Sequence, residues 1–100
     1  MLMTSFKLSE ISPNTLVGRD VGKKIRKDIQ GLVEQHGSIE IDMEDKTNIS
    51  PSFLEEALVL LVLEYGKDNF KNKIILSNIN KGIKALMNSM LSSRLKRKES

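Results

Sequence analysis

The chain contains no cysteine, no tryptophan and a single histidine among its 100 residues. Without cysteine it forms neither disulfides nor thiolate metal sites, and His36 alone offers little to zinc or to cysteine–histidine chemistry. No pattern in the sequence groups a nucleophile, a base and an orienting acid, as nucleophilic catalysis requires. We therefore expect a non-enzyme with no catalytic residues, no metal and no cofactor.

The chain also lacks a long apolar run. Its longest, residues 57–63, falls far short of the roughly 20 residues that span a bilayer. Residues 1–7 contain no charged leader followed by an apolar segment. With 39% hydrophobic residues, the length suits one compact core. We predict a single domain over residues 1–100 of a soluble, cytoplasmic protein, with its core at about 18–94 and a basic tail at 94–100.

Aromatic residues are scarce and the charges are unevenly distributed. The net charge of +3 conceals two basic clusters, which are Lys23, Lys24, Arg26 and Lys27 and then Arg94, Lys96, Arg97 and Lys98. Short charge runs are usually solvated, and 4% aromatic residues offer little stacking for nucleic-acid bases. One candidate function is therefore that of a nucleic-acid-associated accessory protein, which we keep as the alternative to the protein-binding role described below. It would need both basic clusters on one face of the molecule.

Two other patterns suggest ligand sites only superficially. In GRDVGKK, residues 18–24, the glycines are too close for a phosphate-binding loop and no Ser or Thr follows the lysines, so we predict a turn and a helix start. The acidic residues Glu40, Asp42, Glu44 and Asp45 have oxygen ligands for Mg²⁺, but such alternation more often marks the solvated side of a strand.

Three segments have the pattern of short strands. Apolar and acidic residues alternate strictly over residues 39–43, which predicts a half-buried strand. Residues 73–77 hold three consecutive apolar positions, which predicts a fully buried strand. Residues 6–11 form a third, weaker candidate that Pro13 terminates.

Helical spacing appears on either side of these strands. The first predicted helix is capped by Asp20 and ended by Gly37, and its apolar positions are Val21, Ile25, Ile29, Leu32 and Val33. The last begins near Asn80 and has its apolar positions at Ile83, Leu86, Met87, Met90 and Leu91. The order of elements predicts an α/β fold with helices packed on a small mixed or parallel sheet.

The segment between the strands at 39–43 and 73–77 should also be a helix, because parallel strands are joined by crossovers. We place it from residue 51 to about 65, with Ser50 as N-cap, Pro51 at the first helical position and Ile49 stapled to Leu54. A capping box of Ser52 and Glu55 competes with this start. The apolar run 58–63 covers every side of a helix, so something besides the sheet must cover it.

This order of segments resembles a known fold. The strand SIEIDM, the helix PSFLEEALVLLVLEYG, the strand NKIILSNI and the helix NKGIKALMNSML resemble the STAS fold of anti-sigma-factor antagonists and sulfate-transporter tails. The stretch IDMEDKTNISPSFLEEAL more closely resembles a STAS-like family of small bacterial proteins of unknown function. The likeness spans roughly residues 18–94 and implies a regulatory, protein-binding role.

The resemblance also implies a candidate site. In the antagonists, the first serine of an Asp-Ser-Ser or Asp-Ser-Thr loop accepts phosphate from a GHKL-type ATPase. Here Ser50 replaces the aspartate, Pro51 takes the acceptor's place and Ser52 matches the second position. With Ser50 as the cap, the Ser52 hydroxyl is free near the positive helix end, so Ser52 is the candidate phospho-acceptor. We predict docking of such an ATPase, or of a second copy in a homodimer, with no membrane partner and with nucleic acid kept as the alternative. The predicted partner-binding residues are Thr47, Asn48, Ser50, Ser52, Phe53, Val59 and Leu63.

Overall fold

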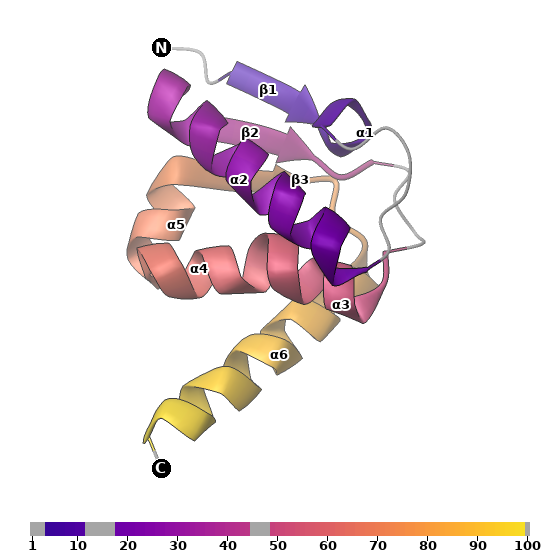
Figure 1. The fold of residues 1–100 in the computed structure, drawn as a ribbon, viewed down its shortest axis with the longest axis vertical. Helices are drawn as coiled ribbons and strands as arrows, with labels where there is room; N and C mark the ends of the chain where they lie inside the picture. Colours follow the sequence, from indigo (N-terminus) through magenta and orange to yellow (C-terminus); the bar gives the residue numbers. More distant parts are fainter. Residues whose placement is uncertain (1–3, 12–17, 45–48, 100) are drawn as a thin grey trace.

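A three-stranded parallel sheet organises the molecule (Figure 1). The computed structural model describes residues 4–11, 18–44 and 49–99. The strands β1 (Thr4–Lys7), β2 (Ile39–Asp42) and β3 (Ile74–Ser77) lie in the order β1-β2-β3. Ile39 of β2 pairs with Thr4 on one side and with Ile74 on the other. The prediction of a small parallel sheet is confirmed, and β1 extends that sheet beyond the predicted core.

Helices connect and follow the strands. They are α1 (Leu8–Ile11), α2 (Arg19–His36), α3 (Pro51–Leu54), the π-helical turn η1 (Glu55–Val59), α4 (Leu60–Tyr65), α5 (Lys67–Lys73) and α6 (Lys81–Glu99). Successive strands are neighbours, so right-handed crossovers place α2 and the α3–η1–α4 helix on the same face of the sheet. Figure 1 shows α2 crossing in front of the strands and the α3–η1–α4 helix running below them in this view. No helix in the described part of the chain is long and apolar enough to cross a membrane.

The two faces of the sheet differ in burial. Ile39 and Ile41 are fully buried under the helices, whereas Glu40 and Asp42 are only partly buried on the opposite face. The prediction of a half-buried β2 is confirmed. The prediction that β3 is fully buried is wrong, because Ile75 lies on the opposite face and is 46% exposed. None of the described helices covers that face.

The first segments also depart from the prediction. The strand predicted at residues 6–11 ends at Lys7, and Leu8–Ile11 is one helical turn instead. Three-residue spacing then brings Leu8 and Ile11 to the same side, where Leu8 is buried and Ile11 packs against the core. Asp20 is not the cap of α2, since Gly18 precedes the first helical residue and has a φ of 98°, which favours glycine. Gly37 ends α2 as predicted.

The apolar run of the central helix lies between three surfaces. The α3–η1–α4 helix packs against α2 on one flank and against α6 on the other, and its buried side chains share one core with those of the sheet. Leu58, Val59, Leu61 and Val62 are all buried in this arrangement. The expectation that something besides the sheet covers the run is confirmed: α2 and α6 cover it.

Candidate functional site

Ser50 holds the start of the central helix in place. Its Oγ accepts a hydrogen bond from the backbone N–H of Phe53 at 3.1 Å, which makes Ser50 the N-cap, and Pro51 occupies the first helical position. The same oxygen accepts the N–H of Gly18 at 3.2 Å. The predicted Ser50 cap is therefore confirmed, and the competing cap at Ser52 is wrong. One hydroxyl joins the starts of α2 and α3.

The neighbouring residues divide between surface and core. Pro51 is exposed and Ser52 is half-buried, with its Oγ 3.3 Å from the Oγ of Ser50. Phe53 and Val59 are core side chains, at 1% and 0% exposure, and this corrects their placement on a partner-binding surface. Leu63 is partly buried against the same core. Thr47 and Asn48 lie outside the described residues. Of the predicted site residues that the structure describes in this turn, Ser50 and Ser52 are partly exposed.

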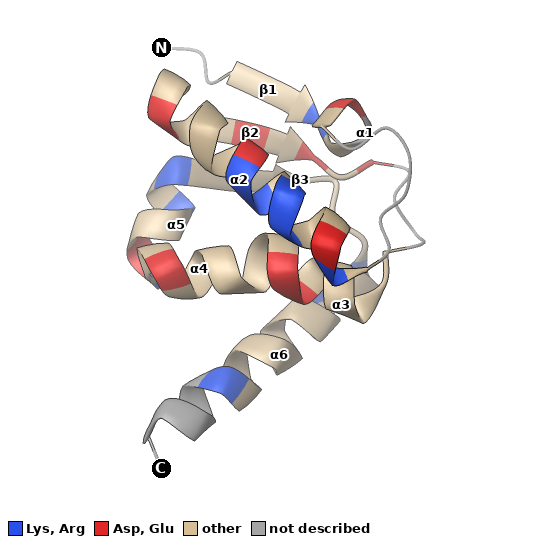
Figure 2. Cartoon of the chain, viewed as in Figure 1, with Lys and Arg blue, Asp and Glu red and all other residues tan. Residues whose placement is uncertain are grey.

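Two carboxylates and three arginines form an ionic network one turn beyond Ser52. Glu55 Oε1 lies 3.0 Å from Arg19 and 3.0 Å from Arg94, which links η1 to both α2 and α6. Glu56 lies 3.2 Å from Arg19 and 3.2 Å from Arg26. Figure 2 shows this acidic turn beside the first turns of α2. The network fixes the helix start on its neighbours.

Arg26 makes the most buried of these contacts. Its side chain is only 18% exposed, and its guanidinium donates to the backbone carbonyl of Glu56 at 2.6 Å as well as to the carboxylate. The carbonyl lies within the π turn, where the N–H of Leu60 bonds back to Glu55 rather than to Glu56. The sequence placed Arg26 on a solvated face, which is wrong. The missed signal is that Arg19 and Arg26, seven residues apart, share one face of α2.

Charge pairing changes the acidity of groups in and near this network. Hydrogen bonds from Arg19, and then from Arg94, lower the pKa of Glu55, and the partnership with Glu55 raises the pKa of Arg19. Outside the network, the pKa of Asp42 is lowered by the Asn78 side chain and then by the backbone N–H of Glu44. Both carboxylates are therefore held in the ionised form by the hydrogen bonds that they accept.

Asp42 is a structural group at the end of β2. Its Oδ1 accepts hydrogen bonds from Glu44 N at 2.9 Å and from Asn78 Nδ2 at 3.0 Å, so it ties the ends of β2 and β3 together. Within the described residues, no group of three or more acidic or histidine side chains is placed to hold a metal ion.

Helix packing accounts for Gly22, the second glycine of the GRDVGKK sequence. A Cβ at this position would lie 2.7 Å from Glu56 Cβ and 3.0 Å from the carbonyl oxygen of Phe53. Glycine therefore allows α2 to approach the central helix closely enough for Arg26 to reach Glu56. Its role is helix packing.

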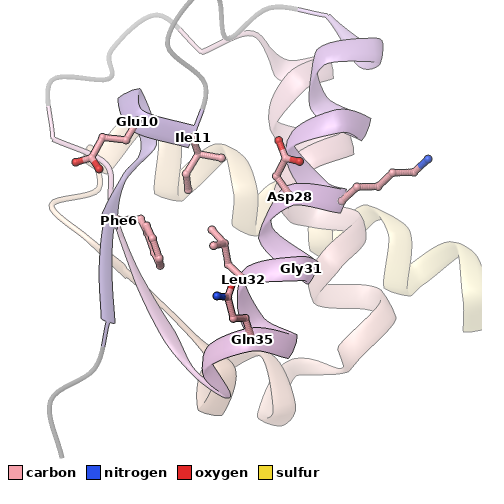
Figure 3. Close-up of a pocket in the computed structure, with 8 residues that line it drawn as sticks. Phe6, Glu10, Ile11, Asp28, Gly31, Leu32 and Gln35 are labelled. Atoms are coloured by element: carbon pink, nitrogen blue, oxygen red, sulfur yellow. The ribbon is translucent and has the colours of Figure 1, made fainter.

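A groove of about 580 Å³ opens on the other side of α2 (Figure 3). Phe6, Ile11 and Leu32 form its apolar part between β1, α1 and α2. Its remaining lining residues are Glu10, Lys27, Asp28, Gly31 and Gln35. Among the described residues, this lining mixes both charge signs and contains no serine, threonine or histidine. The groove does not include any predicted site residue.

Together, the sheet and its capped crossover helix define a small α/β domain with its helices on one face. The chain belongs to the family of STAS-like domains of unknown function (DUF4325), which matches residues 21–84. This confirms the family inferred from the stretch around residues 41–58. No curated protein and no solved structure gives a significant match.

Proposed function

We propose that this domain is a non-catalytic regulatory module that docks a partner protein through the turn before α3 and the first turn of that helix. The observation that carries the proposal is the different use of the two serines. The Ser50 hydroxyl is occupied by the N–H groups of Phe53 and Gly18. Ser52 is half-buried, and among the described residues the one hydrogen bond of its hydroxyl is to the Ser50 hydroxyl. Ser52 is therefore the acceptor that a kinase would modify.

The ionic network gives such a modification a physical effect. A phosphate on Ser52 carries nearly two negative charges and lies at the positive end of a helix. Glu55 and Glu56 follow it by three and four residues, so they share its side of the helix and repel it. Arg19, 57% exposed and shared between both glutamates, is the cation free to turn toward the phosphate. Phosphorylation would then break the ion pairs of Arg19 with the two glutamates and change the charge and shape of the docking surface.

The family resemblance supplies the class of partner. A GHKL-type ATPase fits because the related antagonists exchange phosphate with such enzymes at this position of the fold. A second copy of the chain is the other partner to test. Either partner is compatible with the proposed role as a bacterial cytoplasmic regulator.

Internal pairing weighs against the nucleic-acid alternative. Arg26 and Arg94, one from each basic cluster, are paired with Glu56 and Glu55. Their charges are largely neutralised before any phosphate backbone arrives, so the joint footprint is weaker than the sequence suggests.

The deciding experiment combines intact-mass spectrometry with binding. Protein isolated from its own cells should contain a phosphorylated species that Ser52→Ala abolishes. Affinity for a GHKL-type ATPase that co-purifies with the wild type should change about tenfold in Ser52→Asp, as expected when one charge-assisted contact is altered. Ser89→Asp, at an exposed serine of α6, is the matched control and should leave affinity unchanged. An unphosphorylated protein whose binding is indifferent to Ser52→Asp would contradict the proposal.

A further inference from the structure

A second groove lies on the far flank of the central helix, away from Ser52. It has a volume of about 400 Å³ and runs between α4, α5, the end of β3 and α6. Its apolar lining consists of Val62, Phe70, Leu76, Ile79, Met87 and Leu91. Its polar lining consists of Lys67, Lys71, Lys84 and Asn88, with no acidic residue. The groove is thus apolar inside and positively charged at its rim.

The lysines lie on two opposite sides of the groove, formed by α5 and α6, which we call its two banks. Lys67 and Lys71 are four residues apart on α5 and share one side of that helix. Lys84 lies on α6 together with Asn88, also four residues apart. All four side chains are exposed. Among the described side chains, every ion pair is made by an arginine, so none of these lysines is neutralised by a carboxylate.

We infer that this groove binds an acidic amphipathic helix of a partner protein. Apolar side chains on one face of that helix would enter the groove, and carboxylates on its flanks would meet the lysines of the two banks. A volume of about 400 Å³ is within the range of binding pockets and holds a few such side chains. This surface is separate from the proposed Ser52 surface and does not depend on it.

The chemistry of the lining favours this occupant over two others. A fatty acid brings one carboxylate, whereas three lysines on opposite banks match several carboxylates spread along a segment. Single-stranded nucleic acid binds through base stacking on exposed aromatic rings, and Phe70, the aromatic residue of this lining, is only 7% exposed. The groove therefore matches an acidic peptide in both its apolar and its charged parts.

The test uses the full chain and a synthetic, fluorescein-labelled amphipathic helix with leucines at positions i, i+3, i+4 and i+7 and glutamates on both flanks. Fluorescence polarisation should show saturable binding below about 1 mM. Lys67→Glu combined with Lys71→Glu should weaken binding about tenfold or more, since two attractive pairs become repulsive. Lys23→Glu combined with Lys24→Glu makes the same charge change on α2 and should leave binding within about twofold once screening is included.

Two further measurements separate the groove from a general attraction of charge. Replacing every glutamate of the peptide by glutamine, or every leucine by alanine, should reduce its affinity, because both kinds of contact are required. Methyl NMR signals of Val62, Leu76 and Met87 should shift on titration. No binding, equal weakening by the α2 variant, or shifts confined to other residues would overturn the inference. Binding of oleate or phosphatidylglycerol vesicles in place of the peptide would overturn the choice of occupant.

Discussion

The two flanks of the central helix are held by different means. On the α2 side, the helices touch through Gly22, Arg26 donates to backbone and side chain of Glu56, and Ser50 bridges to Gly18. On the α6 side, the described polar contact is the pair of Arg94 with Glu55, and a groove of about 400 Å³ remains open nearby. Close backbone approach and directed hydrogen bonds fix one flank, while an apolar groove remains open beside the other.

Gly22→Ala should give a large loss of stability on the fixed flank. The new methyl group meets Glu56 Cβ at 2.7 Å and the Phe53 carbonyl at 3.0 Å, and overpacking of this kind costs about 1–3 kcal/mol of unfolding free energy. Gly31→Ala is the matched control in the same helix, because its Cβ meets nothing within 4 Å. It should be stabilising by about 0.5–1 kcal/mol. Urea denaturation measures both, and equal effects would refute the tight contact.

Arg26→Met should cost more than Arg94→Met. The first substitution removes two hydrogen bonds to Glu56, whose side chain is 10% exposed, and hydrogen bonds to charged groups contribute about 1.5–3 kcal/mol. The second removes a single pair to Glu55 from a side chain that is 36% exposed, and solvent screening limits its loss to below about 1 kcal/mol. Thermal unfolding of both variants under one buffer condition tests the order, and a reversed order would contradict the comparison.

Ser50→Ala should destabilise the domain by about 1 kcal/mol or slightly more, since the cap of α3 and the link to Gly18 are both lost. Ser52→Ala provides the control two residues away and should fall within about 0.5 kcal/mol of wild type. Chemical denaturation decides between them. A larger loss in Ser52→Ala than in Ser50→Ala would contradict the assignment of Ser50 as the cap and would indicate Ser52 instead.

Glu55→Gln should produce the smallest effect, visible as a change in acid sensitivity. The pKa of Glu55 is lowered in the folded state, so its ionised form adds stability above the ordinary pKa of about 4.3. That contribution disappears as pH falls through the lowered value. The unfolding free energy of the variant should therefore decline less steeply with acid than that of wild type. Parallel declines below about pH 4.3 would show that Glu55 contributes nothing to the acid response.

The sequence predicted features that depend on local or periodic patterns. The alternation around Ile39 and Ile41 indicated which face of β2 is buried, and Ser50 followed by Pro51 located the helix start. These signals need no knowledge of distant residues. Family membership was likewise readable from one continuous stretch.

Other features depend on tertiary contacts that no local pattern specifies. Gly22 was unexplained until Glu56 was placed beside it, 34 positions further along the chain. Ile75 was expected to be buried because an apolar run does not reveal that one face of the sheet has no described cover. The π turn at Glu55–Val59 has no recognised sequence signal. Its structural role becomes visible through Arg26, which donates a hydrogen bond to the Glu56 carbonyl within the turn.

The regular spacing of the strands has a consequence for how the chain folds. Thr4 pairs with Ile39 and Ile39 with Ile74, so the pairing steps from 4 to 39 and from 39 to 74 both span 35 residues. Neither ladder starts from a hairpin, and each requires loop closure before its first hydrogen bond forms. Mixed α/β domains with such distant pairings fold more slowly than helical bundles and faster than all-β proteins. Despite its many helices, this domain should refold at a rate set by bringing its three short strands together.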